Sequence, residues 1–195
     1  MRNHYFISFL SCILLITLLG GCGKKDPAAG SENNPAPENN LSSAKEADTT
    51  AVPVSFEALT LDGNSLSSDL FSESRITMIN VWATYCNPCL SEMPGLGELA
   101  SSYDPGDFQL IGIISDVMED ADEGTLTHAA DLVAETGADY PHLLLSESLY
   151  YALLTDVSAV PTTFFVDQDG QILDTVIGAM EKSAWEEKIN ALLEE

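Results

Sequence analysis

The residues best suited to chemistry are two cysteines, Cys86 and Cys89, which are separated by two residues. They follow the apolar run 76–83 and stand where a helix over residues 86–102 is predicted to begin. At this spacing the sulfurs can form a disulfide, and the unpaired N–H groups of the helix start stabilise a thiolate on Cys86. Because the thiolate is the nucleophile of disulfide exchange, we expect Cys86 to be the exposed attacking sulfur and Cys89 the buried resolving one. Pro88 suits the first helical turn, where a missing N–H is tolerated.

Three other uses of a cysteine pair are less favoured. A zinc site needs four ligands, and the chain after residue 22 offers only His128 and His142 beside the pair, at no finger-like spacing. A structural disulfide across so short a loop would constrain little chain entropy. Covalent haem attachment requires His directly after Cys89, where Leu90 stands. We therefore expect a redox-active pair, with no metal and no cofactor other than the disulfide itself.

The N-terminus has the pattern of an export signal. Residues 1–21 begin with Arg2 and continue as an apolar run, 6–19, which is short for a membrane span. The run ends in LGGC, which resembles the lipobox of bacterial lipoproteins. This resemblance implies cleavage before Cys22, a lipid on its sulfur and loss of Cys12 with the signal. An uncleaved membrane anchor is the alternative, and both place the rest of the chain outside the cytoplasm, at a bacterial cell membrane.

The remaining chain divides into a tether and a domain. Residues 22–52 are rich in Asn, Ser and Pro and hold almost no large apolar residue. Such a composition cannot bury a core, so it predicts a flexible tether. Residues 53–195 have the length and the apolar patterning of one globular domain.

The patterning of this domain predicts an α/β fold. A β-hairpin is expected over residues 55–65, where an alternating segment leads into turn residues. Further strands are predicted over residues 76–83, 108–114, 142–145, 162–166 and 172–177. Helices are predicted over residues 86–102 with a kink at Pro94, 125–136 ended by Gly137, 148–154, and 184–193 capped by Ser183. This order predicts helices that flank a central mixed β-sheet.

Residues 80–89, NVWATYCNPC, resemble the active-site segment of thioredoxins. Residues 90–94, LSEMP, resemble the TlpA/ResA-like branch of that superfamily, whose members are extracytoplasmic, membrane-tethered disulfide reductases. Residues 160–164, VPTTF, match the cis-proline loop of the family, and the segment after Ile114 matches an insertion that this branch carries. The resemblance runs from about Val54 to the C-terminus and implies a thioredoxin-like fold.

The resemblance also implies which residues meet a substrate. Pro161 would be the cis proline that faces the cysteines, and the main chain of Val160 would pair with a substrate peptide as an added strand. Three further residues are expected beside the substrate: Trp82, Tyr85 and Pro88.

Glu92 matches the acidic residue that this branch keeps one helical turn past the second cysteine, where it tunes the thiols and moves protons. A carboxyl three residues after Cys89 lies on the same helix face, and partial burial would raise its pKa toward a range useful for proton transfer. The alternative is an ordinary first-turn Glu that the helix dipole favours. Asn80 stands where thioredoxins carry a buried Asp that accepts a proton. Asn cannot accept a proton, so this role would be absent here or would be taken by Glu92.

The charge of the chain limits its partners. It holds 7 Lys and Arg against 31 Asp and Glu, a net charge of −24, which repels phosphate backbones and argues against nucleic-acid binding. The acidic stretch 116–123 lacks the ligand spacing of a calcium loop and is expected to be a solvated loop.

Three functions stay open. A reductase would keep the cysteines of exported proteins reduced, as in cytochrome c maturation, and would draw electrons from a membrane thiol–disulfide donor. An oxidase or isomerase would instead form or rearrange disulfides. A non-catalytic lipoprotein would bind peptides in the cis-proline groove. Protein thiols or disulfides are the expected partners, the lipid anchor provides the membrane contact, and we expect a monomer.

Overall fold

The structure is a computed structural model and describes residues 52–194. The predicted signal 1–21, Cys22 and the tether as far as residue 51 lie outside these residues. Within the described part, no helix has both the length and the apolar character that crossing a membrane requires.

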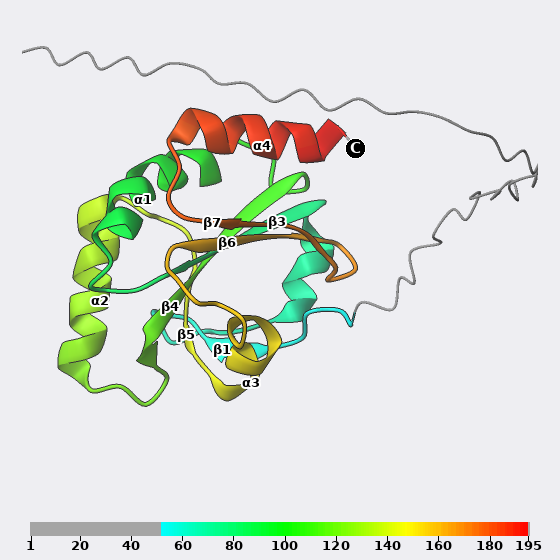
Figure 1. The fold of residues 1–195 in the computed structure, drawn as a ribbon. Coiled ribbons are helices and arrows are strands. Elements are labelled where there is room, and N and C mark those ends of the chain that lie inside the picture. The colour runs from blue at the N-terminus through cyan, green and yellow to red at the C-terminus, as the bar shows by residue number, and fades with distance from the viewer. Residues whose placement is uncertain (1–51, 195) are drawn as a thin grey trace, which may run out of the picture. The chain divides into compact units, whose positions relative to one another are not determined.

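Strands and helices follow one another in the predicted order (Figure 1). The strands are β1 (Glu57–Leu59), β2 (Ser65–Ser67), β3 (Ile76–Trp82), β4 (Phe108–Met118), β5 (His142–Leu145), β6 (Thr162–Asp167) and β7 (Ile172–Ile177). The helices are α1 (Asn87–Ala100), α2 (Glu123–Thr136), α3 (Glu147–Leu149) and α4 (Lys182–Glu194), with a 3₁₀ helix η1 (Ser68–Glu73) and a π-helical turn η2 (Tyr150–Leu154).

Five strands form one mixed sheet in the order β5-β4-β3-β6-β7. The central strand β3 pairs in parallel with β4 and antiparallel with β6, and every one of its residues is buried. A strand covered on both faces must be apolar almost throughout, which explains the run that the sequence shows there. As predicted, β1 and β2 form a separate hairpin.

The two faces of this sheet pack against different elements (Figure 1). Because side chains alternate along a strand, Met78 and Trp82 enter a core shared with α1, α2 and α4. Ile79 and Val81 enter a second core, under the N-terminal hairpin, η1 and α3. Asn80 lies in phase with Met78 and Trp82, so its amide is directed toward α1, where it meets Glu92.

The prediction of a solvated loop over residues 116–123 was correct in that most of these residues are exposed, and wrong in that the segment is not a loop throughout. β4 continues to Met118, and the carboxylate of Glu119 accepts the N–H of Leu59 at 2.7 Å. Asp122 caps α2, because its carboxylate accepts N–H groups from the first turn of that helix. The segment expected as an insertion after Ile114 therefore holds the end of β4, the whole of α2 and β5.

Other boundaries differ by smaller amounts. Gly137 ends α2 as predicted, with a left-handed φ of 65°. α4 begins at Lys182, and the Glu181 carbonyl accepts its first N–H bonds, so Ser183 is not the cap. The helix predicted over residues 148–154 is divided into α3 and η2.

Candidate active site

Cys86 is the N-cap of α1 rather than its first helical residue. It forms a disulfide with Cys89, and the two Cα atoms lie 5.3 Å apart. The N–H of Cys89 points at the Cys86 sulfur over 3.3 Å. When the bond is reduced, this N–H and the positive end of the helix dipole stabilise a thiolate on Cys86.

The two sulfurs differ less in exposure than predicted. Cys89 is fully buried, as expected, but Cys86 is only 6% exposed. The loop before β6 covers the Cys86 sulfur, and the carbonyl oxygen of Val160 in this loop lies 3.6 Å from it. A substrate sulfur therefore has to approach Cys86 along this loop.

The peptide bond between Val160 and Pro161 is cis, as predicted. No backbone hydrogen bond joins the amide or the carbonyl of Val160 to another described residue, whereas the Pro161 carbonyl accepts the N–H of Gly178 at 2.8 Å. The N–H and the carbonyl of Val160 are therefore both free to pair with an extended peptide that lies beside them. Tyr85, 76% exposed, and the exposed Pro88 stand on the surface at the cysteine pair.

Asp116, at the end of β4, fixes the loop that leads to Cys86. Its carboxylate accepts the backbone N–H of Thr84 at 3.0 Å and the Thr84 hydroxyl at 2.6 Å. On the neighbouring residue, the Ser115 hydroxyl donates to the Trp82 carbonyl at 2.9 Å. Sequence reasoning missed this anchor, because it treated Asp116 only as one member of an acidic stretch.

Glu92 lies on α1 three residues after Cys89, is buried at 6% exposure, and is not an ordinary first-turn carboxylate on the surface. Its carboxylate accepts from Asn80 Nδ2 at 3.0 Å, from the N–H of Met180 at 3.1 Å and from Trp185 Nε1 at 3.2 Å. Burial raises the pKa of Glu92 above its ordinary value, and the three hydrogen bonds oppose this shift only in part. A buried carboxyl with a raised pKa can take up and release a proton.

Asn80 connects Glu92 to the sheet. Its Nδ2 donates to Glu92 and, at 3.1 Å, to the hydroxyl of Thr163, while its Oδ1 has no partner among the described residues. If its amide group rotates by half a turn, Asn80 can accept a hydrogen bond from protonated Glu92 through Oδ1. In the present orientation it donates N–H to the ionised carboxylate. Sequence reasoning missed the pairing, although an amide inside an apolar strand is a signal that a buried partner exists.

Trp82 does not meet the expectation that it contacts the substrate, because it has no exposed surface. Its Nε1 donates to His142 Nδ1 at 3.1 Å, and His142 Nε2 lies 3.0 Å from the carbonyl of Ala138. Burial lowers the pKa of His142 to about 4, so at neutral pH the ring is uncharged and carries its proton on Nε2. The Trp82–His142 pair supports the active-site loop from within the core.

A model of the Redoxin family matches residues 32–193. The chain belongs to the Redoxin family. This Redoxin chain is 30% identical to the thiol:disulfide interchange protein HelX of Rhodobacter capsulatus over 146 residues, which cover 73% of the chain and 74% of HelX. It is 29% identical to the thiol-disulfide oxidoreductase ResA of Bacillus thuringiensis over 108 residues, 55% of the chain and 58% of ResA. The match thus spans less than two thirds of the ResA length.

A solved structure gives the same fold. The thiol:disulfide interchange protein of the thioredoxin family from Chlorobium tepidum superposes with a TM-score of 0.60 at 24% identity, over 72% of this chain and 95% of that one. These comparisons confirm the predicted thioredoxin-like fold and the likeness to the ResA-type branch. The Redoxin site combines a disulfide at a helix start, a free main-chain edge and a buried carboxyl, and thiol–disulfide exchange can use all three.

Proposed function

We propose that this Redoxin chain is a membrane-tethered, extracytoplasmic thiol–disulfide oxidoreductase that reduces disulfides of exported proteins, apocytochromes c among them. The observation that carries the proposal is the Cys86–Cys89 disulfide at the start of α1, next to the free main chain of Val160. The likeness to ResA, a thiol-disulfide oxidoreductase, and to HelX, a thiol:disulfide interchange protein, supports the same chemistry. The reaction needs no cofactor beyond the cysteine pair.

The proposed reaction has two exchange steps. The Cys86 thiolate attacks one sulfur of a substrate disulfide, so that a mixed disulfide forms and the other substrate sulfur leaves as a thiolate and takes a proton. The sulfur of Cys89 then attacks Cys86, forms the Cys86–Cys89 bond and releases the second substrate thiol. The substrate thus gains two electrons and two protons from the enzyme. A membrane dithiol carrier then reduces the Cys86–Cys89 disulfide again, and the carrier's own dithiol is oxidised to a disulfide.

We assign the proton transfer of the second step to Glu92. Cys89 is fully buried, so its thiol needs a base inside the protein before it can attack. Glu92 follows it by one helical turn and has a raised pKa, and Asn80 can pair with either protonation state of its carboxyl. Substrate contact is assigned to the main chain of Val160 and to the side chains of Tyr85, Pro88 and Pro161.

A redox titration tests the proposed direction of electron flow. The full chain in detergent, equilibrated in thiol–disulfide buffers, should have a potential nearer the value of thioredoxin, about −270 mV, than that of the oxidant DsbA, about −120 mV. The fraction of the Cys86–Cys89 disulfide is read by thiol alkylation and mass spectrometry. A potential near that of DsbA would rule out the reductase and favour an oxidase.

Cys22 is the proposed site of lipid attachment, and its replacement tests the membrane tether. A labelled fatty acid fed to the producing bacterium should appear on the wild-type chain and be absent from the Cys22→Ser variant, which should also keep residues 1–21. Label on Cys22→Ser, or a wild-type chain without label, would contradict the lipoprotein assignment.

A further inference from the structure

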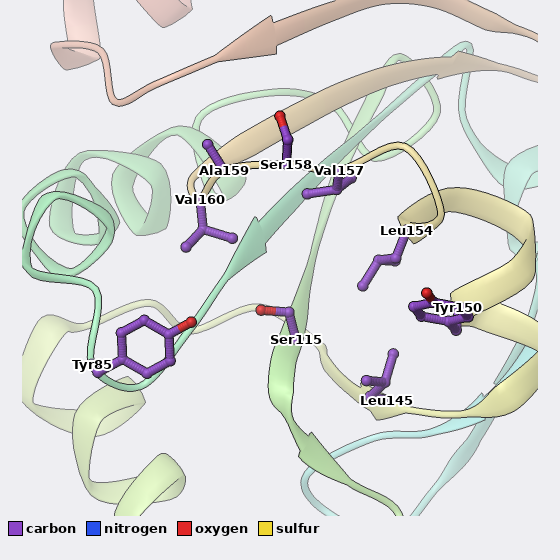
Figure 2. A pocket seen from close by; sticks show the side chains of 9 residues that line it. All are labelled: Tyr85, Ser115, Leu145, Tyr150, Leu154, Val157, Ser158, Ala159 and Val160. Atoms are coloured by element: carbon purple, nitrogen blue, oxygen red, sulfur yellow. The ribbon is translucent and has the colours of Figure 1, made fainter.

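An apolar pocket is lined by Tyr85, which directly precedes Cys86, and by Val160, whose carbonyl oxygen lies 3.6 Å from the Cys86 sulfur (Figure 2). Tyr85 and Val160 lie on one side of it in this view, and Leu145, Tyr150 and Leu154 lie on the other. The walls thus come from the active-site loop, the cis-proline loop and the segment from β5 to η2. The pocket has a volume of about 260 Å³, below the roughly 300–1,000 Å³ typical of small-molecule sites, so it suits a single side chain better than a cofactor.

The position of the pocket identifies its occupant. Val160 belongs both to the pocket wall and to the main-chain edge beside Cys86, whose sulfur lies 3.6 Å from the Val160 carbonyl. A polypeptide that is held by Cys86 in a mixed disulfide and pairs with Val160 therefore lies next to this pocket. A residue next to the substrate cysteine can place its side chain there while the backbone pairs with Val160.

The lining selects the kind of side chain. Among the described residues, none with a charge lines the pocket, and aromatic or aliphatic side chains make up most of its wall. The hydroxyl of Ser115 at its floor already donates to the Trp82 carbonyl. Tyr150 is 44% exposed and Tyr85 76% exposed, so both present apolar ring surface that a substrate side chain could cover.

The surrounding charge selects the residues that flank this side chain. Asp116 and Asp156, next in sequence to the lining residues Ser115 and Val157, are exposed. Every Lys and Arg side chain within residues 52–194 is paired with a carboxylate: Arg75 with Asp107, Lys182 with Glu98, and Lys188 with Asp174. The domain therefore presents an uncompensated negative field around the pocket, which attracts basic segments.

We propose that this pocket is a specificity subsite for the substrate polypeptide. It takes an aromatic or aliphatic side chain next to the substrate cysteine, and the acidic surroundings favour Lys or Arg further along the same segment. The inference rests on the proposed exchange function and adds the class of sequence on which that function acts.

The test compares matched peptide disulfides. The reduced full chain in detergent is mixed with four peptides of equal length, which carry Phe or Ser beside the cysteine and Lys or Glu in the flanks, and with uncharged hydroxyethyl disulfide. We expect the Phe peptide to react about tenfold faster than the Ser peptide, because part of its ring leaves water. We expect Lys flanks to add about another tenfold at low ionic strength, an advantage that salt removes.

Tyr150→Ala should bring the Phe-to-Ser rate ratio close to one. The matched control is Leu173→Ala, since Leu173 is an apolar side chain with nearly the same exposure, 45%, and does not line the pocket. This control should keep the ratio and the rate with hydroxyethyl disulfide. Equal rates for the Phe and Ser peptides, or equal loss in both variants, would overturn the subsite. A wild-type chain that reduces none of these disulfides would instead overturn the proposed function.

Discussion

Replacing Gly97 by alanine should lower the free energy of unfolding by about 3 kcal/mol, the upper range for overpacking. A Cβ at this position of α1 would lie 2.2 Å from the carbonyl oxygen of Gly137, at the end of α2. The obstacle is backbone, which cannot rotate away as the end of a side chain can. The two helices would have to separate, and the core between α1 and the sheet would open with them. Chemical denaturation followed by circular dichroism measures the loss.

Gly95→Ala is the matched control, because it lies on the same helix two residues earlier. The added Cβ would contact only Lys182, and it would lie 3.1 Å from the Lys182 Cβ. Helix propensity also favours Ala over Gly by about 1 kcal/mol. We expect its stability to stay within about 1 kcal/mol of the wild type. Equal losses in both variants would show that the contact between α1 and α2 is not the cause.

Replacing Glu92 by glutamine should slow disulfide exchange about 100-fold at neutral pH, the lower range for loss of a general base. The wild-type rate should rise with pH through the raised pKa of Glu92, because only the carboxylate accepts a proton from Cys89. The variant should lack this rise. The new amide side chain fits the site, since Asn80 can turn its unpartnered Oδ1 toward it. Stopped-flow rates between about pH 4 and 9, a range that spans the ordinary carboxyl and thiol pKa values, provide the measurement.

Stability supplies an independent readout of the same carboxyl. Since burial raises the folded-state pKa of Glu92 above the ordinary value of 4.5, the stability that Glu92 confers is complete below that value and is lost as the pH rises through the folded pKa. The stability of the wild type relative to Glu92→Gln should therefore decrease with pH over this interval.

The control for the rate measurement is Glu98→Gln. It changes an exposed carboxylate on the same helix and should keep the wild-type pH–rate profile. A wild-type profile in Glu92→Gln would remove Glu92 from the mechanism.

The strands and the cysteine site were predictable because their causes are local in sequence. The continuous apolar run at β3 follows from burial on both faces, and Cys86 is held at a helix start that Pro88 marks. The cis bond before Pro161 came from family resemblance, since nothing in the residues themselves separates it from a trans one. These features need no knowledge of the final packing.

The missed features all depend on groups far apart in sequence that the fold brings together. The pairing of Asn80 with Glu92 joins residues 12 apart, and the contact of Trp185 with Glu92 joins residues 93 apart. Asp116 was misjudged because its carboxylate meets a loop 32 residues away, which no local pattern records. The low exposure of Cys86 has the same origin, because the covering carbonyl belongs to Val160.

The most direct test of the account is to trap the mixed disulfide in the native cell envelope with full-length variants. Cys89→Ser should accumulate covalent complexes with exported proteins, and peptide mapping should place the new bond on Cys86. Cys86→Ser should give at least about tenfold fewer complexes, because Cys89 is fully buried. Equal trapping through Cys89 in the Cys86→Ser variant, or no complex with either variant, would contradict Cys86 as the attacking sulfur.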